Sequence, residues 1–383
     1  MNKKILSVVV PTKNRYTYLI SFIKVCSTFN SDEFELVIQD NSDDNQEILT
    51  FLTNNNYAFI VYNHISSKLS MSENSDFGIK NSSGEYVCFM GDDDLLSPKL
   101  IDFVKYMKEN NIESAVFNRA SYNWPGVKSK FHKFPSLVIP NHSSKIKKLS
   151  VKREYGKLLK KGATSLLNMP QLYHGVIRRD ALNKVYETCG TFFPGPSPDL
   201  AVSVALAFFV KNHVFADAPL ISSGVSPKSS AGLGSNHMHK GKLSEVSFMP
   251  KNIEEIWDER IPKIWTGPTI YAESLFETLK ALDKEKEIRY FNFSYFFAFF
   301  EMFNSDYKEM SKRYRKALKI SSLSVFVCSV GVFLLRAKEF IKNIFRIKFK
   351  IGVKMFDNVP NTFEAEQIID DNTKVINFKK THI

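Results

Sequence analysis

The sequence lacks the glycine-rich signatures of two large classes of nucleotide-binding protein. It contains no Gly-x-Gly-x-x-Gly fingerprint and no Gly-Lys-Ser/Thr phosphate loop. The first motif brings the pyrophosphate of a dinucleotide against a helix N-terminus, and the second holds the phosphates of ATP or GTP. A dinucleotide-dependent enzyme and a P-loop NTPase are therefore both disfavoured.

Cysteine is also scarce. The chain of 383 residues has four cysteines, scattered without the paired spacing of a zinc site: Cys26, Cys88, Cys189 and Cys328. Such usage suits a reducing compartment. The opening residues show no basic segment followed by an apolar segment and a small-residue cleavage site, because a strand pattern begins at Ile5. We therefore expect a cytoplasmic protein.

Among the features that are present, an apolar segment that ends in three consecutive carboxylates is the most informative. Residues Val87–Met90 are short enough for a buried strand, and Asp92, Asp93 and Asp94 follow closely. Adjacent carboxylates repel unless a cation neutralises them, and hard oxygen ligands suit Mg²⁺ or Mn²⁺. A divalent ion that bridges the protein to a diphosphate is the first hypothesis. The alternative is an acidic turn that caps the helix beginning near Pro98.

The N-terminal third alternates between strand and helix patterns. Strands are expected over 5–10, 34–38, 57–62 and 86–90, and helices over 18–29, 46–54 and 72–81. This alternation predicts parallel pairing through right-handed crossovers, with ligands bound at the carboxyl ends of the strands. The polar clusters that follow the first, second and fourth strands should then meet at one edge of the sheet.

Several segments of this region, in their order and spacing, resemble the family 2 glycosyltransferases with the GT-A fold. The resemblance lies in Val8–Arg15, Val37–Asp44, Ser72–Asn74, Ser83–Val87 and Asp92–Asp94. It is clear over residues 5–120, extends to about 235 and is absent beyond. It implies an α/β fold of the nucleotide-diphospho-sugar transferase type, a Rossmann-like mixed sheet flanked by helices.

The resemblance also implies roles for individual residues. Asp92 and Asp94 match the two ends of the Asp-x-Asp motif, which places the sugar nucleotide through Mn²⁺ or Mg²⁺. By position, the donor-binding residues would be Pro11, Thr12, Asn14, Arg15, Asp40, Asn74, Asp92 and Asp93. The metal ligands would be Asp94 and Asp92.

An inverting transferase also needs a general base that takes the proton of the acceptor hydroxyl. The candidate is Asp199, which follows a loop rich in proline and glycine and opens the apolar segment 200–210. The resemblance favours this role, because family members carry their base at the head of a helix well after the metal motif. An aspartate at a helix start is also an ordinary N-cap, and this alternative stays open.

Two further segments are candidates for the acceptor side or for a lid. His174 lies at the polar entrance of a predicted strand, although a lone histidine is more often structural. The segment 222–240 is small, polar and glycine-rich, so we expect it to be mobile. It could close over the diphosphate, with Lys228, His237 or His239 on phosphate or metal. A surface loop without function is an equal alternative.

The formal net charge of +12 is concentrated toward the C-terminus. Residues 290–300 are aromatic-rich, and the apolar segment 320–335 has about 16 residues, fewer than the ~20 that span a bilayer. Basic and apolar residues then alternate to about 354, as in a helix that lies on an anionic membrane. A packed helical subdomain with a solvated basic face is the alternative. Nucleic acid is disfavoured because no binding module accompanies the charge.

Length and composition suit a globular catalytic domain with a smaller second domain. We expect the GT-A domain over 1–240, with a donor-binding half over about 1–120 and an acceptor half over about 121–240. A mostly helical domain over 241–356 and a flexible, polar and acidic tail over 357–383 should follow.

The function expected from these features is that of a metal-dependent inverting glycosyltransferase. It would move a sugar from a nucleotide-diphosphate sugar, with a UDP-sugar favoured, to a hydroxyl of a lipid-linked glycan in surface polysaccharide synthesis, at the inner face of the cell membrane. A nucleotidyltransferase is one alternative, but it normally has a glycine-rich basic loop after the first strand, where this chain has Pro11–Arg15. A catalytically silent membrane scaffold is another.

Overall fold

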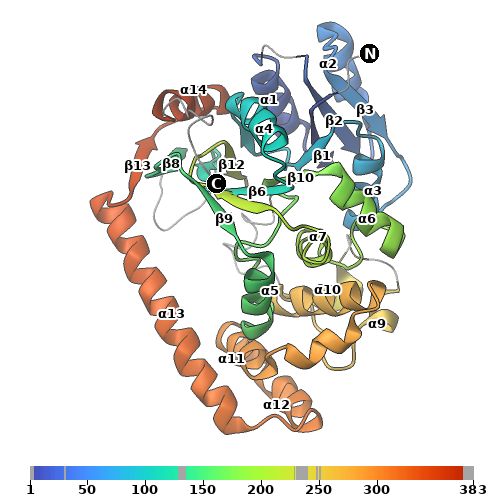
Figure 1. Ribbon diagram of the computed structural model, residues 1–383, viewed down its shortest axis with the longest axis vertical. Helices are drawn as coiled ribbons and strands as arrows, with labels where there is room; N and C mark the ends of the chain where they lie inside the picture. Colours follow the sequence, from blue (N-terminus) through green and yellow to red (C-terminus); the bar gives the residue numbers. More distant parts are fainter. Residues whose placement is uncertain are drawn as a thin grey trace.

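The computed structural model describes residues 4–29, 32–127, 135–227, 229, 240–246, 249 and 252–373. Within them a mixed sheet of eight strands has the order β3-β2-β1-β4-β10-β6-β11-β9 (Figure 1). Its strands are β1 (Leu6–Thr12), β2 (Phe34–Asp40), β3 (Ile60–His64), β4 (Tyr86–Phe89), β6 (Ser114–Phe117), β9 (Ile146–Leu149), β10 (Gly175–Arg178) and β11 (His213–Ala216).

The direction of the strands places several carboxyl ends at one edge. β1 pairs in parallel with β2 and β4, and β2 pairs in parallel with β3, as the sequence predicted. β10 is antiparallel to both β4 and β6. β4 and β6 therefore point the same way, and the residues that follow them lie at the same edge as those that follow β1.

A second, smaller sheet runs beside this edge. Its order is β13-β8-β7-β12-β5 within the described residues. The strands are β5 (Leu95–Leu96), β7 (Ala120–Asn123), β8 (Ser136–Pro140), β12 (Ile221–Val225) and β13 (Val353–Asp357). Because β5 follows the acidic segment directly, this sheet ties the segment to residues more than a hundred positions later in the chain.

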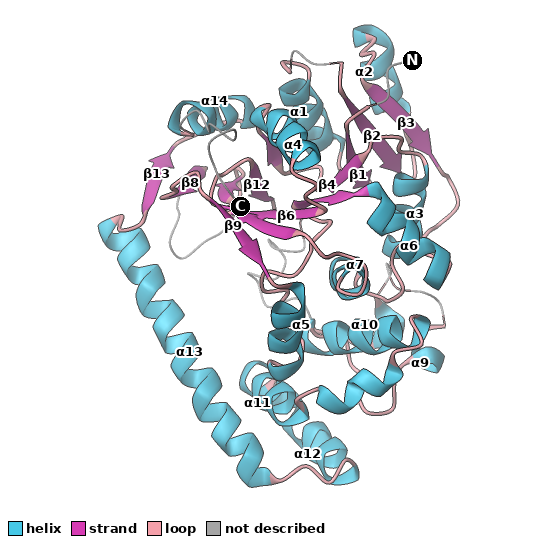
Figure 2. Ribbon diagram, in the orientation of Figure 1, coloured by secondary structure: helices cyan, strands magenta, loops and turns pink. Residues whose placement is uncertain are grey.

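Helices cover both faces of the large sheet (Figures 1 and 2). Val8 and Val10 pack into the core beneath α1 and α4, whereas Val9 packs on the opposite side with residues of α6 and α7. All three valines are fully buried, as in a strand covered on both faces. The helices of this part are α1 (Tyr16–Cys26), α2 (Gln46–Asn55), α3 (Met71–Lys80), α4 (Lys99–Glu109), α5 (Val151–Lys160), α6 (Arg179–Cys189) and α7 (Pro198–Leu206).

The region after residue 240 is mostly helical, as expected, and its apolar core is continuous with the part before it. Leu158 of α5 and Leu200 of α7 belong to the same buried cluster as Phe276 and Phe296. The helices are α9 (Ile253–Ile256), α10 (Gly267–Ala281), α11 (Phe293–Phe303), α12 (Lys308–Ala317) and α13 (Ser322–Phe349). These observations confirm a mixed α/β fold with a largely helical C-terminal region.

The expectation of a flexible tail from residue 357 is wrong over the described part of that segment. β13 pairs with β8, and α14 (Thr362–Asn372) packs against α1. Ala365 and Ile369, one helical turn apart, are buried in a cluster with Trp124. Polar composition concealed this short apolar stripe. Residues 374–383 lie outside the described part.

One buried carboxylate in α10 makes stability depend on pH. Glu273 is fully buried, and both of its side-chain oxygens accept hydrogen bonds from the backbone N–H of Asp258, at 3.1 and 3.0 Å. Burial raises the pKa of Glu273 from its ordinary 4.5 to about 8. The unfolded chain therefore releases this proton at lower pH than the folded chain does, and stability should fall as pH rises from 4.5 to 8.

We expect Glu273→Gln to remove this dependence. Glutamine keeps an oxygen acceptor for the Asp258 amide and carries no charge. The melting temperature of the variant should exceed that of the wild type by an amount that grows between pH 5 and pH 8, measured by thermal unfolding. Glu259→Gln, at an exposed neighbouring position, is the matched control and should show no such trend. A pH-independent difference for Glu273→Gln would contradict the assignment.

Candidate active site

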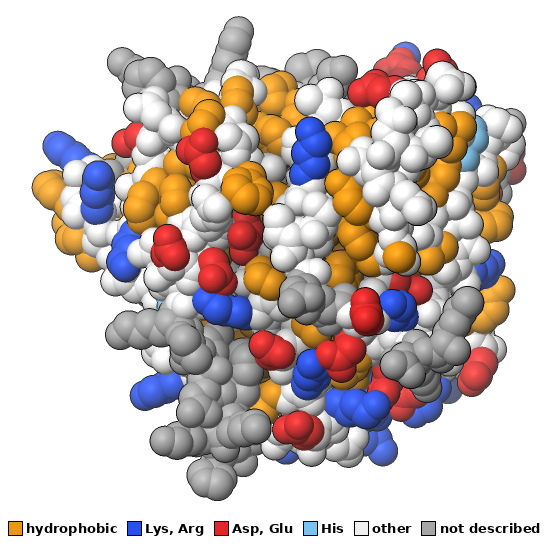
Figure 3. Space-filling view, turned by 90° about the horizontal axis from the view of Figure 1, so that it is seen from above, with side chains coloured by type: hydrophobic (Ala, Val, Ile, Leu, Met, Phe, Trp, Pro, Cys, Tyr) orange, Lys and Arg blue, Asp and Glu red, His pale blue; other side chains and the backbone are white. Residues whose placement is uncertain are grey.

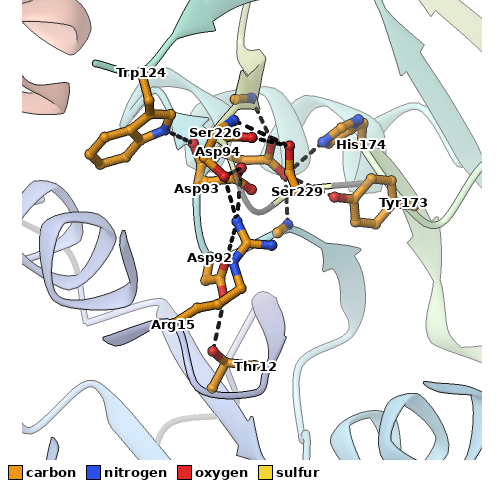
Figure 4. Close-up of polar contacts among 12 residues, drawn as sticks. Thr12, Arg15, Asp92, Asp93, Asp94, Trp124, Tyr173, His174, Ser226 and Ser229 are labelled. Atoms are coloured by element: carbon orange, nitrogen blue, oxygen red, sulfur yellow. Dashed lines mark hydrogen bonds and ion pairs between the residues drawn. The ribbon is translucent and has the colours of Figure 1, made fainter. Parts of the chain in front are cut away.

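The three carboxylates that follow β4 lie at the centre of the site. Asp92, Asp93 and Asp94 are only 3%, 4% and 2% exposed. Figure 4 shows Arg15 and Thr12 on one side of them, and His174 and Tyr173 on the other. The polar residues after β1 and β4 therefore meet, as the predicted parallel sheet required.

Arg15 neutralises two of the carboxylates. It occupies the N-cap position of α1, directly after β1. Its Nη2 lies 3.0 Å from Asp92 Oδ1 and 2.9 Å from Asp93 Oδ2. Thr12 Oγ1 donates to Asp92 Oδ2 at 2.8 Å, and Ser226 Oγ donates to Asp93 Oδ2 at 2.5 Å. Burial still raises the pKa of Asp92 to about 7, although the positive charge of Arg15 opposes this shift.

Asp94 is held by a different set of partners. Its Oδ2 accepts from the backbone N–H of Gly91 at 2.6 Å and contacts His174 Nε2 at 2.6 Å. Its Oδ1 accepts from the backbone N–H of Gly224 at 2.7 Å. On the far side of the imidazole, Arg119 Nη1 lies 2.6 Å from His174 Nδ1. A guanidinium can only donate, so Nδ1 accepts, and Nε2 of the neutral ring carries the proton and donates it to Asp94.

The backbone around Asp94 is shaped to bring these groups together. His174 has a φ of +58°, a left-handed conformation that is uncommon outside glycine, and its N–H donates to the carbonyl of Phe89 at 3.0 Å. Gly224 lies so close to the acidic segment that a Cβ there would be 1.7 Å from the carbonyl oxygen of Asp93. Only glycine lets β12 run against this segment without a shift of the backbone.

Asp199 lies at the start of α7, but it is not the N-cap residue. Ser197 holds that position, and Asp199 is the second residue of the helix. Asp199 Oδ1 accepts from Ser197 Oγ at 2.5 Å and from the N–H of Leu200 at 3.0 Å. Asp199 Oδ2 accepts from the hydroxyl of Tyr271 at 2.9 Å. The N-cap alternative is therefore wrong, although the carboxylate does satisfy one backbone N–H of the helix.

Arg119 connects the surroundings of Asp94 and Asp199. The negative charge of Asp199 and burial raise the pKa of Tyr271 well above its ordinary value, and the charge of Arg119 opposes this shift. Burial by the surrounding protein lowers the pKa of Arg119, and the negative charge of Asp94 opposes this shift. The Arg119 side chain nevertheless remains accessible to solvent. These features suit a cation that an anionic ligand can reach.

Sequence reasoning missed Arg119 and Tyr271. It placed Gly224 and Ser226 in a mobile segment, which is wrong at this point, because Gly224 lies in β12 and both residues contact the acidic segment. Arg119 had a usable signal, because it follows β6, whose carboxyl end lies at the same sheet edge as that of β4. Tyr271 lies in α10, far along the chain, and its contact with Asp199 depends on how α10 packs on α7. Tertiary packing of this kind leaves no local pattern in the sequence.

The structure places Asp40 beside the site but not on its surface. The carboxylate is fully buried at the end of β2. Its Oδ2 accepts from the hydroxyls of Tyr16 at 2.7 Å and Tyr62 at 2.8 Å, and its Oδ1 accepts from the N–H of Ser42 at 2.8 Å. A direct contact with a nucleotide is not favoured by this arrangement. Asp40 instead fixes the loops after β1 and β2.

The remaining donor-side residues take varied positions. Asn14 has a φ of +57° and donates from Nδ2 to Asp43 at 2.7 Å. Pro11 is part of β1. Asn74 is buried in α3, where its Nδ2 contacts the carbonyl of Gln39 at 3.4 Å and its Oδ1 has no hydrogen-bond partner among the described residues. Lys228, His237 and His239, expected as lid contacts, lie outside the described residues.

A cavity of about 410 Å³ opens where the loops after β1 and β2 meet the starts of α1 and α2. It is lined by Asn14, Arg15, Tyr16, Thr17, Tyr18, Asp43, Asp44 and Glu47. Arg15 joins this cavity to the carboxylates. A ligand bound here would thus lie next to the acidic segment.

The residues present fit a divalent ion that is shared with a ligand. No group of three or more His, Cys, Asp or Glu side chains in the described part of the chain forms a ready metal site. Mg²⁺, however, is commonly held by one or two carboxylates together with substrate phosphates. Oδ1 of Asp92 is buried and, apart from its ion pair with Arg15, has no hydrogen-bond partner among the described residues. His174 orients Asp94 as a hydrogen-bonded group behind a metal ligand does.

Comparison with known proteins shows which protein family this chain resembles. The family model "Glycosyl transferase family 2" matches residues 7–184. An uncharacterized glycosyltransferase of Rickettsia conorii is 30% identical over 133 residues, 34% of this chain and 21% of that protein. One of Rickettsia bellii is 33% identical over 120 residues, 30% of this chain and 16% of that protein. The chain thus spans about a fifth of the length of the curated relatives it matches.

Solved structures align with this chain at low similarity. TarS 1-349 of S. aureus in complex with UDP-GlcNAc has a TM-score of 0.47 and 13% identity, over 85% of this chain and 79% of that one. The mannosyltransferase PcManGT from Pyrobaculum calidifontis, in complex with GDP-Man and Mn²⁺, has a TM-score of 0.41 and 12% identity, over 97% of this chain and 87% of that one.

The mixed sheet and the buried acidic segment at its carboxyl edge define an α/β domain of the GT-A type. Residues 7–184, a little under half of the chain, match the model of glycosyl transferase family 2. The resemblance seen in the sequence motifs is thereby confirmed.

The close approach at Gly224 gives a direct test of this geometry. Gly224→Ala should destabilise the protein by roughly 1–3 kcal/mol or more, because the added Cβ forces β12 away from the backbone of Asp93. The matched control is Gly331→Ala in α13, where a Cβ meets open space and should stabilise the helix by up to about 1 kcal/mol. Chemical unfolding measures both. Equal effects of the two substitutions would show that β12 does not approach the acidic segment this closely.

Proposed function

We propose that the protein is a metal-dependent inverting glycosyltransferase. It transfers a sugar from a nucleotide-diphosphate sugar, with a UDP-sugar favoured, to a hydroxyl of a glycan acceptor. The observation that carries the proposal is the buried trio Asp92, Asp93 and Asp94 at the carboxyl edge of the sheet, in a chain that matches the model of this family. Such a concentration of negative charge calls for a cation, and a diphosphate is the ligand that brings one.

On the donor side, the nucleoside would occupy the cavity beside Arg15 and the diphosphate would lie over the acidic segment. Asp94 and Asp92 would hold Mn²⁺ or Mg²⁺, which when bound neutralises the charge of the departing diphosphate. Arg15 keeps Asp92 and Asp93 close together by its two ion pairs. His174 orients Asp94 through its Nε2 proton, and Arg119 fixes the tautomer that makes this possible.

On the acceptor side, Asp199 would act as general base. Its Oδ1 already accepts two hydrogen bonds, from Ser197 and Leu200, whereas its Oδ2 accepts one, from Tyr271. A carboxylate oxygen has room for two. Oδ2 is therefore the atom that would take the proton of the acceptor hydroxyl, as that oxygen attacks the sugar on the face opposite the diphosphate.

The acceptor is proposed to be a lipid-linked glycan of surface polysaccharide synthesis, met at the inner face of the cell membrane. Support comes from the basic and apolar C-terminal segment rather than from the site itself. A catalytically silent scaffold would bind the donor without turnover, so binding and turnover must be measured separately.

The metal role is tested by Asp94→Asn. The substitution keeps the shape of the side chain and removes the charge that a divalent ion needs, so turnover should fall by at least about a hundredfold. Isothermal titration with UDP, with and without Mn²⁺, should show that the enhancement by metal is lost. Asp371→Asn, at an exposed position of α14, is the control. Undiminished metal enhancement in Asp94→Asn would remove Asp94 from the metal site.

The base role is tested by Asp199→Asn. We expect kcat to fall by roughly 10²–10⁴-fold, because the amide cannot take the proton, while donor affinity stays nearly unchanged. Tyr271→Phe, which removes one hydrogen bond to the carboxylate but leaves its charge, should have a smaller effect. A wild-type kcat for Asp199→Asn at saturating acceptor would leave Asp199 a structural residue of α7.

A further inference from the structure

The longest helix of the protein exposes an apolar face that nothing in the described chain covers. α13 has 28 residues. Its face toward the protein is marked by Val325 and Val332, which are buried against the α11 region. Apolar side chains on other faces of α13 are between 46% and 71% exposed: Leu323, Phe326, Val327, Val330, Phe333, Leu334, Leu335, Phe340, Ile341, Phe345 and Phe349.

These exposed side chains form a continuous surface along the helix. Phe326, Phe333 and Phe340 recur every seven residues and therefore share one line. A second line, at spacings of three, four and seven residues, lies beside it and contains Leu323, Val327, Val330, Leu334, Ile341 and Phe345. We call these two lines together the α13 apolar face. A soluble protein rarely exposes a patch of this size unless it binds something.

The charges next to the α13 apolar face are almost all positive. From residue 336 to the end of the helix and its C-cap, Glu339 is the sole acidic residue, against six basic ones: Arg336, Lys338, Lys342, Arg346, Lys348 and Lys350. The guanidinium of Arg336 lies over the ring of Phe303 in α11, which leaves five basic residues for the exposed surface. On the left of Figure 3, the side on which α13 lies in Figure 1, blue basic side chains border orange apolar ones. Apolar area with adjacent cations matches the chemistry of an anionic lipid surface.

We propose that the α13 apolar face docks in the plane of a membrane that contains anionic lipids. The phenylalanines would insert below the headgroups, and the lysines and arginines would meet the lipid phosphates. Within the described residues no helix combines the length and hydropathy needed to cross a bilayer, so α13 would lie on the membrane. This surface goes beyond the proposed transfer reaction and does not depend on it.

A second copy of the chain is the competing occupant, because a seven-residue repeat also suits a coiled coil. Charge disfavours it. In a parallel pair, the basic ends after residue 336 would face each other with a single glutamate per chain to offset them. In an antiparallel pair, the basic end of one helix would lie on the apolar start of the other.

The helix is held so that docking needs no rearrangement. Its N-terminal half packs on α11, and the chain after it returns through β13, which pairs with β8. Both ends of α13 are therefore attached to the body of the protein, as Figure 2 also shows. A membrane beneath this helix would lie in a fixed orientation to the active site.

Co-sedimentation with vesicles tests the proposal on the full chain. The protein should bind vesicles of phosphatidylcholine with phosphatidylglycerol much more tightly than vesicles of phosphatidylcholine alone, and high salt should weaken binding. The variant Phe326→Gln/Phe333→Gln/Phe340→Gln should lose binding. Its three sites are 59–65% exposed, so circular dichroism and melting temperature should stay unchanged.

A charge variant and a matched control make the test specific. Lys338→Gln/Lys342→Gln should weaken binding to the anionic vesicles roughly 30-fold. Lys80→Gln/Lys184→Gln, on α3 and α6 at the opposite side of the molecule in Figure 1, removes the same charge and should have little effect.

Three outcomes would overturn the proposal. The first is no binding to anionic vesicles at low salt, and the second is binding that neither α13 variant weakens. The third is a dimer, seen by analytical ultracentrifugation, that the phenylalanine variant dissociates while vesicle binding is absent. Hydrolysis of a nucleotide sugar by the same samples reports separately on the proposed transferase.

Discussion

Three adjacent carboxylates buried at the edge of a sheet are the constraint on which much of this structure depends. Burial raises the pKa of Asp92 and of Asp93 and so favours the neutral forms of these two carboxyl groups. The chain stabilises them with a guanidinium from the start of α1, backbone N–H groups of Gly91 and Gly224, and the imidazole of His174. These groups come from distant parts of the sequence, so the acidic segment also fixes where α1, β10 and β12 lie.

The buried carboxylates of this region divide into two kinds by their partners. Asp40 is held by two tyrosine hydroxyls and a backbone N–H, and it locks two loops. Asp92 and Asp93 share one guanidinium that is itself partly exposed. A ligand can compete for Arg15 far more easily than for the hydroxyls around Asp40. Aspartate thus makes the loop after β2 rigid. After β4 it instead supplies a negative charge whose partner, Arg15, a ligand can draw away.

Sequence patterns predicted the strands β1, β2 and β4 and their parallel pairing, because these features follow from local periodicity. They also predicted that Thr12, Arg15 and Asp92 meet, because the direction of the strands brings their carboxyl ends to one edge. The third strand begins at Ile60 rather than at Tyr57. The burial of Asp40, the contact between Tyr271 and Asp199, and the helix α14 were not predicted. Each depends on packing between segments far apart in the chain, and α14 also hides two buried residues in an acidic sequence.

The return of the chain after α13 has a consequence for how the protein forms during synthesis. Tyr122 donates to the carbonyl of Val359, Lys99 pairs with Asp370 at 2.7 Å, and Ile369 packs near Trp124. The first helix and the smaller sheet therefore stay uncovered on a ribosome until residues 362–372 emerge. Domains usually fold as they are made, but this one must keep apolar surface open while more than two hundred further residues are added after Trp124. Stalled or shortened chains should be aggregation-prone for this reason, even when they contain every residue of the acidic site.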